Sequence, residues 1–205
     1  MQKIVKIGIR WLECLSMHAG EMEICKIDLM KLADNLSSEH EGFCWLSVIQ
    51  SLIASSKNTF GVGAVIVDAN GKVIVEGHNQ VFNPYFRSDL HAEMVVLNKL
   101  ENLRKSEEPP VNYTLYTSLE PCMMCLGRSI FSRIGHLYFV AKDPHGGVIN
   151  NTHIPFTLAN LMEQQVIQEA ACQLALKDIS SRIVAFSVQQ LVDKLGGTID
   201  VMGAN

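Results

Sequence analysis

The hydrophobic period of this sequence changes at residue 61. Before that point, a run of apolar residues recurs at helical steps and predicts a helix with one apolar stripe, formed by Trp45, Leu46, Ile49, Leu52 and Ile53. After it, residues 61–68 and 72–77 are apolar and rich in valine and isoleucine, and the turn sequence Ala69-Asn70-Gly71 separates them. This arrangement predicts a β-hairpin that directly follows a long helix.

Helical and strand-like segments alternate after the hairpin. We expect helices at 91–103 and 122–134, strands at 113–118 and 136–141, and a mostly helical segment at 156–195 with a short strand near 165–167. A hairpin followed by this alternation predicts an α/β fold: a three-layer α-β-α sandwich around a mixed sheet of about five strands. In such sheets, reactive groups gather where strands end and helices begin.

Three helix starts carry recognisable signals. Ser38 and Glu41 have the spacing of a capping box, and Ser88 or Asp89 is expected to cap the helix that contains residues 91–103. Pro121 is expected in the first turn of the next helix, where a missing backbone N–H costs nothing. Residues 1–37 are predicted to be a separate N-terminal stretch, with apolar residues at helical spacing in its second half.

Composition narrows the class of protein. The chain has 17 Lys and Arg against 21 Asp and Glu, a net charge of −4, which disfavours a large nucleic acid as partner without excluding one. No apolar run is long enough for a membrane span, so no membrane association is expected. The six cysteines lack the spacing of a disulfide framework, which predicts a reducing cytoplasm. Cys122 and Cys125 form a Cys-x-x-Cys pattern. The other four cysteines are expected to be small buried apolar residues: Cys14, Cys25, Cys44 and Cys172.

The pattern that carries chemistry lies at two predicted helix starts. His91 and Glu93 open one helix, and Cys122 and Cys125 open the next, three residues apart and so on one helical face. A histidine and two thiolates would bind zinc through three protein ligands and leave a fourth position for water. Zinc lowers the pKa of water from about 15.7 to about 7. Glu93 is then expected to carry protons as the catalytic acid and base.

Other classes of protein can contain parts of this pattern. A Cys-x-x-Cys pair at a helix start also occurs in dithiol oxidoreductases. A structural zinc site would need a fourth ligand, commonly from a second such pair, and the sequence has none. A metal-binding relic could retain the fold without turnover, although an intact Glu93 argues against that class. The accompanying His-x-Glu segment favours a catalytic zinc over a redox pair.

The combination His-x-Glu with Pro-Cys-x-x-Cys is a general signature of zinc nucleobase deaminases. The longer segments GVGAVIVDANGKVIVEGHN, LHAE and LYTSLEPCMMCLGRSIFSRIGHLYFVAKD resemble the cytidine and deoxycytidylate deaminase superfamily. They are most similar to the branch with guanine deaminases, cytosine deaminases and tRNA adenosine deaminases. The resemblance covers roughly residues 38–170 and implies a zinc-dependent deaminase domain at 38–205, a helical extension at 1–37 and a homodimer.

The resemblance also implies residues that contact the substrate. These are Asn79, which would bind the base, Val62 and Ala64, whose strand would line the pocket, and Asp143, which would lie near a sugar. Asn79 and Asp143 are also common turn residues, so a structural role is the alternative for both. The branch often has Asp-Pro-Thr shortly before the histidine, whereas this chain has Arg87-Ser88-Asp89-Leu90.

The sequence therefore predicts a cytoplasmic hydrolase of purine or pyrimidine metabolism. We expect zinc-dependent hydrolytic deamination of a small nucleobase or nucleoside of the guanine, cytosine or adenosine type, with release of ammonia. The alternative is a tRNA-specific adenosine deaminase, which converts adenosine to inosine. Because all these bases have an amino group on a carbon next to a ring nitrogen, the catalytic residues alone do not choose among them.

Overall fold

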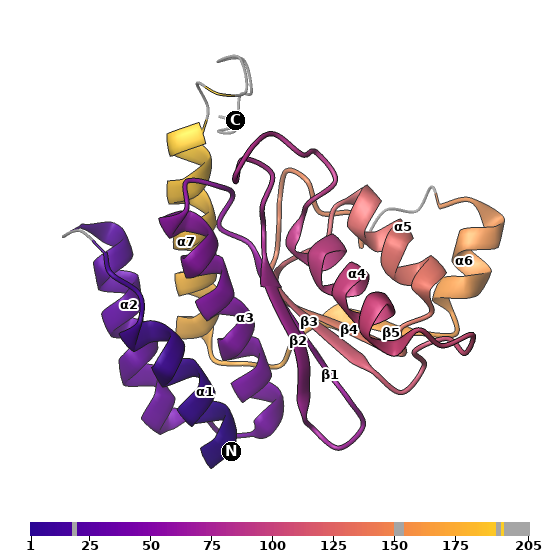
Figure 1. Cartoon of the computed structure of the whole chain (residues 1–205), viewed down its shortest axis with the longest axis horizontal. Coiled ribbons are helices and arrows are strands. Elements are labelled where there is room, and N and C mark those ends of the chain that lie inside the picture. The colour runs from indigo at the N-terminus through magenta and orange to yellow at the C-terminus, as the bar shows by residue number, and fades with distance from the viewer. Residues whose placement is uncertain (18–19, 150–153, 192–193, 195–205) are drawn as a thin grey trace.

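The computed structural model describes residues 1–17, 20–149, 154–191 and 194 of the 205-residue chain (Figure 1). The helices are α1 (Gln2–Glu13), α2 (Glu21–Leu32), the short 3-10 helix η1 (Ala33–Asn35), α3 (Glu39–Ser56), α4 (Ala92–Arg104), α5 (Met123–Ser132), α6 (Phe156–Met162) and α7 (Leu174–Leu191). The strands are β1 (Gly63–Val67), β2 (Val73–His78), β3 (Thr114–Leu119), β4 (His136–Ala141) and β5 (Val166–Glu169).

The five strands form one mixed sheet in the order β2-β1-β3-β4-β5. β1 runs antiparallel to both of its neighbours, while β3, β4 and β5 run parallel to one another. The predicted fold class is confirmed, including the short strand near residue 166. β2 and β3 both run opposite to β1, and β4 runs parallel to β3. The last residues of β2, β3 and β4 and the first residues of β1 therefore lie along one edge of the sheet, the edge formed by the strand ends.

Helices cover both faces of this sheet. α3 and α7 lie on one face, and α4 and α5 lie on the other, with α6 beside α5 (Figure 1). α1 and α2 pack against the outer side of α3 and α7 and so add a layer beyond the predicted sandwich. Among the described residues, no helix combines the length and the apolar character that crossing a membrane requires.

The N-terminal helices pack closely on α3. Trp45 is fully buried, and its indole N–H donates to the Leu29 carbonyl of α2 at 2.9 Å. Gly8 of α1 faces the same ring, and a Cβ at that position would lie 2.1 Å from it. A side chain at residue 8 would therefore separate α1 from α3. The sequence showed helical spacing only in the second half of residues 1–37, whereas residues 2–13 also form a regular helix with an apolar inner face.

The prediction of a single apolar stripe on α3 is wrong. Nearly every residue from Glu41 to Ser55 is buried, because the sheet covers one side of the helix and the N-terminal helices and α7 cover the others. The helix tolerates buried serines because their hydroxyls bond to its own backbone. Ser47 donates to the Cys44 carbonyl and Ser51 to the Val48 carbonyl, each at 2.7 Å.

The predicted helix boundaries are partly correct. Ser38 caps α3 by accepting from the Glu41 N–H at 3.2 Å, but the Glu41 carboxylate accepts from Ser37 and not from Ser38, so the capping box is incomplete. The cap predicted at Ser88 or Asp89 is wrong, because His91 is the N-cap of α4. Pro121 precedes the α5 N-cap and does not lie in the first turn. The predicted helix up to residue 195 extends into positions outside the described residues.

Candidate active site

The two predicted helix starts meet at the edge where β2 and β3 end. His91 is the N-cap residue of α4, and Cys122 is the N-cap residue of α5, both in extended backbone conformation. Cys125 lies in the first turn of α5 and is 1% exposed. The fold thus brings His91 next to two cysteines that lie more than 30 residues further along the chain, as the sequence predicted.

The three candidate ligand atoms have the spacing of a zinc site. The His91 Nδ1 atom is 3.6 Å from the Cys122 Sγ and 3.6 Å from the Cys125 Sγ, and all three atoms lie within 4.8 Å of one another. A tetrahedral zinc, with Zn–S bonds of about 2.3 Å and a Zn–N bond of about 2.0–2.1 Å, places nitrogen and sulfur ligands about 3.6 Å apart. The donor set therefore fits a zinc ion in both chemistry and geometry.

Electrostatics in this cluster favour a thiolate at Cys122. Hydrogen bonds from Cys125 and His91 lower the pKa of Cys122 to about 4, although partial burial opposes the shift. The hydrogen bond to Cys122, together with burial, raises the pKa of Cys125. Within the described ranges, no further His, Cys, Asp or Glu completes a four-ligand set around them. A closed structural zinc site does not fit this arrangement.

Glu93 lies directly beside the ligand cluster. It belongs to the first turn of α4, is 3% exposed, and accepts from the Cys125 thiol at 3.3 Å through Oε2. Its other oxygen accepts from the Thr117 hydroxyl of β3 at 3.1 Å. Burial raises the pKa of the Glu93 carboxyl above its usual range, which suits a group that takes up and returns protons. Sequence reasoning missed Thr117, because a threonine inside a strand pattern carries no signal of such a contact.

Asn79 is buried at the same edge, immediately after β2. Its Oδ1 accepts from the Thr59 hydroxyl at 2.6 Å and from the Val81 N–H at 3.0 Å. Because a backbone N–H can only donate, the atom that faces Val81 must be the amide oxygen. The Nδ2 group is left as a donor for an acceptor outside this network. Thr59 was missed in the sequence, since only the fold places it next to Asn79.

Val62 and Ala64 lie beside Asn79 at the start of β1. The Val62 carbonyl accepts from the Asn79 backbone N–H at 2.9 Å. Ala64 is fully buried and pairs with Gly77 of β2 and Thr117 of β3. Its backbone is therefore engaged in the sheet on both sides. A contribution of either residue to a substrate pocket stays a prediction.

Asp143 shapes the loop after β4. Its Oδ1 accepts from the backbone N–H groups of His145 and Gly146 at 3.0 and 2.9 Å, which is the turn-forming role of an aspartate. The buried Glu120 holds both ends of the same loop, because its carboxylate accepts from the Asp143 N–H at 3.3 Å and the Ile149 N–H at 3.0 Å. The sequence placed Glu120 next to Pro121 and Cys122 but indicated no role for it.

Helix α7 and helix α3 hold the strand ends in place. Ser180 donates to the Ser118 carbonyl at 2.6 Å, and Ser187 accepts from the Gly61 N–H at 2.8 Å. Ser118 in turn accepts from the Gly63 N–H at 3.0 Å. A Cβ at Gly63 would lie 2.3–2.4 Å from backbone atoms of α3, so only glycine allows β1 to begin this close to that helix.

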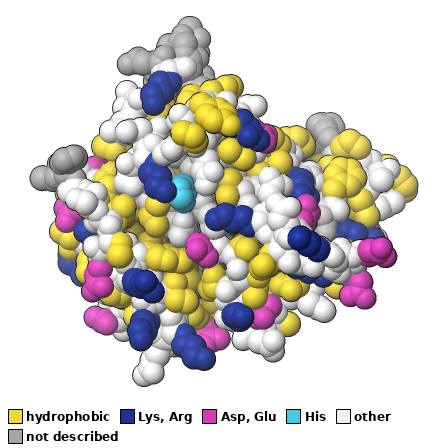
Figure 2. Space-filling view, in the orientation of Figure 1, with side chains coloured by type: hydrophobic (Ala, Val, Ile, Leu, Met, Phe, Trp, Pro, Cys, Tyr) yellow, Lys and Arg dark blue, Asp and Glu magenta, His cyan; other side chains and the backbone are white. Residues whose placement is uncertain are grey.

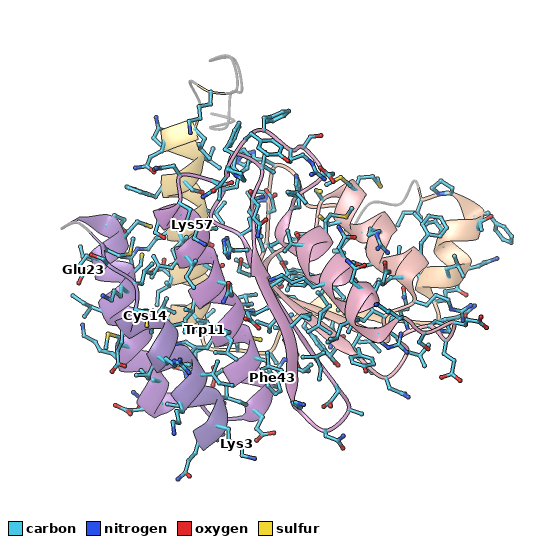
Figure 3. The ribbon with its side chains drawn as sticks, in the orientation of Figure 1. Lys3, Trp11, Cys14, Glu23, Phe43 and Lys57 are labelled. Carbon is cyan, nitrogen blue, oxygen red and sulfur yellow. The ribbon has the colours of Figure 1, made fainter. Side chains whose placement is uncertain are left out.

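The basic side chains near this edge are largely neutralised or scattered. Arg87 pairs with Asp89 at 2.7 Å, and Arg128 of α5 pairs with a glutamate of α4 at 2.6 Å. Lys57, at the end of α3 (Figure 3), lies 3.1 Å from the His78 ring; burial and this lysine lower the pKa of His78 to about 4, so the ring is uncharged at neutral pH. Figure 2 shows Lys and Arg side chains interspersed with acidic and apolar ones on the face of the molecule that is turned to the viewer.

The part of the chain that contains most of the site residues also matches known proteins. Residues 37–141, half of the chain, match the family model for the cytidine and deoxycytidylate deaminase zinc-binding region. The chain is 30% identical over 152 residues to a tRNA-specific adenosine deaminase of Rickettsia typhi, covering 74% of this chain and 96% of that protein. It is 40% identical over 104 residues to the enzyme of the same name from Rickettsia felis, covering 50% of this chain and 71% of the relative.

Solved structures show the same architecture. One, from a study of A-to-I editing by tRNA:A34 deaminases, superposes with a TM-score of 0.57 at 28% identity and covers 65% of this chain and 100% of that chain. A guanine deaminase from Nitrosomonas europaea superposes with a TM-score of 0.57 at 18% identity and covers 84% of this chain and 97% of that chain. The second likeness is one of fold alone.

Proposed function

We propose that this chain, which belongs to the family of the cytidine and deoxycytidylate deaminase zinc-binding region and is a hydrolytic deaminase, acts on a small nucleobase or nucleoside. The reaction replaces an exocyclic amino group by oxygen from water and releases ammonia. The base would be of the guanine, cytosine or adenosine type.

The proposed roles divide the site into two parts. His91, Cys122 and Cys125 would hold Zn²⁺, because their donor atoms have the spacing and chemistry of a tetrahedral site with a free fourth position. Zinc at such a site supplies a nucleophile from water at neutral pH.

Glu93 would move the protons of the reaction. Thr117 holds one carboxylate oxygen, and the other lies 3.3 Å from the Cys125 sulfur, so the group sits beside the ligands without being one of them. It would take a proton from water, deliver it to the ring nitrogen, and assist departure of ammonia. Asn79 would donate from Nδ2 to an acceptor on the base edge, since its oxygen is already used by Thr59 and Val81.

The charge of the segments around the site supports the small substrate. Three basic residues around the site each pair with an acidic residue of the same chain. They are Arg87 on the loop before α4, Arg128 on α5 and Lys142 after β4. A protein that binds tRNA neutralises several phosphates with basic side chains, which these pairs and a net charge of −4 do not provide.

A tRNA substrate is the second candidate function. The Rickettsia relatives are tRNA-specific adenosine deaminases by name, and this favours adenosine in tRNA. Tyr85 and Phe86 are 64% and 62% exposed on the loop that joins Asn79 to His91. Exposed aromatic rings beside a deaminase site can stack on unpaired bases.

The experiment that separates these functions is ammonia release from guanine, cytosine, adenosine and cytidine, run beside inosine formation in a tRNA pool. We expect turnover of at least one small molecule with little dependence on salt. Inosine formation in tRNA that falls steeply with added salt, without turnover of any small molecule, would replace the first proposal by the second.

We further propose that the protein acts in the cytoplasm as a homodimer, and that residues 1–37 are an extension of a domain at 38–205. Light scattering on the purified chain tests the dimer. A shortened chain that starts at residue 38 tests the extension, and we expect it to lose stability because Trp45 and Gly8 join the two parts.

A further inference from the structure

Two cysteines outside the candidate zinc site lie next to each other. Cys44 is fully buried on α3, and Cys172 is half-buried in the connection that crosses from β5 to α7. Figure 1 shows that connection running from the strand β5 to the face of the sheet that α3 and α7 cover. The sequence predicted both as small buried apolar residues, but Cys172 is partly exposed to solvent.

Hydrogen bonds of Gln173, the residue after Cys172, hold this connection beside the start of α3. The Gln173 N–H donates to the Glu41 carboxylate at 2.8 Å, and the Gln173 side chain donates to the Asn35 carbonyl at 2.9 Å. Cys44 is one helical turn after Glu41 and therefore on the same side of α3. Cys172, which directly precedes Gln173, packs against the core cluster that contains Cys44, and the two thiols are close enough for each to shift the pKa of the other.

The two thiols have different electrostatic surroundings. The hydrogen bond from Cys44 lowers the pKa of Cys172, and the nearby Lys177 ammonium acts in the same direction. The same hydrogen bond, together with burial, raises the pKa of Cys44. A partly exposed cysteine with a lowered pKa, next to a buried cysteine with a raised pKa, is the arrangement of an attacking cysteine and a resolving cysteine.

We propose that Cys172 and Cys44 form an oxidisable dithiol that reacts with hydroperoxides. The Cys172 thiolate attacks the peroxide oxygen, which breaks the O–O bond, gives a sulfenic acid and releases the alcohol or water of the hydroperoxide. The Cys44 sulfur then attacks the Cys172 sulfur, expels water and forms a disulfide. Two thiols lose two hydrogens in total, one hydroperoxide is reduced, and a dithiol reductant reverses the change.

The disulfide would join α3 directly to the segment that leads into α7. These two helices cover one face of the sheet, and α7 holds the strand ends at the active site through Ser180 and Ser187. The cross-link would close a long loop of chain, which restricts the unfolded state, so the oxidised protein should unfold at a higher temperature.

To test this, the full-length, zinc-loaded protein is treated with limiting hydrogen peroxide. Its free thiols are then alkylated and its peptides are mapped. We expect a linked peptide pair containing Cys44 and Cys172, a rise in Tm, and reversal of both by dithiothreitol. Cys172→Ser should form no link, while Cys14→Ser, which removes an exposed cysteine elsewhere, should form it as the wild type does.

The variant Cys44→Ser checks the order of events. Without its resolving partner, Cys172 should accumulate as a sulfenic acid that a 1,3-diketone reagent traps. Circular dichroism and zinc content show whether each variant is folded. Oxidation of Cys172 to a sulfinic acid in the wild type without a link to Cys44 would overturn the proposal. So would prior oxidation of Cys122 and Cys125 with loss of zinc.

Discussion

The two halves of the candidate site use their side chains differently. In the proposed metal and proton half, formed by His91, Glu93, Cys122 and Cys125, the side chains mainly contact one another. In the proposed recognition half, formed by Val62, Ala64, Asn79 and Asp143, the polar groups bond to the chain's own backbone and hydroxyls. The contacts of the second half therefore also support the fold. Among the described residues, the Asn79 Nδ2 group has no acceptor in this network.

The largest effect should follow from removing a thiolate ligand. Cys122→Ser and Cys125→Ser should each lose zinc and reduce deamination to background, because two ligands do not retain the ion as three do. Metal analysis together with ammonia release measures both effects. Cys14→Ser is the matched control, since that exposed cysteine lies outside the cluster and should keep zinc and activity. Full zinc content in both ligand variants would remove these residues from the metal site.

Glu93→Gln should separate metal binding from proton transfer. The amide keeps the size of the side chain but cannot carry protons, so zinc should stay bound while kcat falls by roughly 10²–10⁴-fold. Thr117→Val is the companion variant, because it removes one hydrogen bond to the carboxylate and keeps the carboxylate itself. It should cause a much smaller loss. Near-normal turnover by Glu93→Gln would mean that another group moves the protons.

Asn79→Ala should reduce recognition and leave the metal in place. A base edge left without its donor costs about 1–3 kcal/mol, so kcat/KM should fall by roughly 5–150-fold with zinc content unchanged. Thr59→Val should give a smaller loss of the same kind, because Asn79 would lose the hydroxyl that orients its amide. Equal kcat/KM for Asn79→Ala and the wild type would exclude Asn79 from base binding.

Asp143→Ala should have the smallest effect on turnover. The aspartate bonds to backbone N–H groups of its own loop, so its loss should lower the free energy of unfolding by about 1 kcal/mol and change kcat/KM only a few-fold. Asp143→Asn keeps an acceptor oxygen and should restore most of the stability. If Asp143→Ala instead reduces kcat/KM as much as Asn79→Ala, the residue contacts substrate directly.

The difference between the two halves of the site also explains how much of the site could be predicted from the sequence. His91 and Glu93, and Cys122 and Cys125, are pairs at fixed short spacing at helix starts, so local geometry already places each pair. The hairpin and the alternating period likewise predict the sheet that joins the two pairs. The contacts of Thr59, Thr117 and Glu120 depend on residues far away in the chain, and a short sequence pattern does not encode them.

The outer layer of helices shows a second limit of sequence patterns. The period of α3 predicted one buried face, but α1 and α2 cover another, and a helix buried on most sides has no clear amphipathic signal. The closeness of Cys44 and Cys172 was hidden for a related reason. Their proximity depends on the hydrogen bond between Gln173 and Glu41, which joins distant parts of the chain.

One zinc ion, held by His91, Cys122 and Cys125, should be required for deamination. The most direct measurement removes the metal with a chelator and titrates zinc back while recording ammonia release from the best substrate of the panel. Activity should rise linearly and level off at one zinc per chain, and Glu93→Gln should take up the same amount of zinc without recovering activity. Ammonia release that persists at the wild-type rate in metal-free protein would show that deamination does not need the zinc ion.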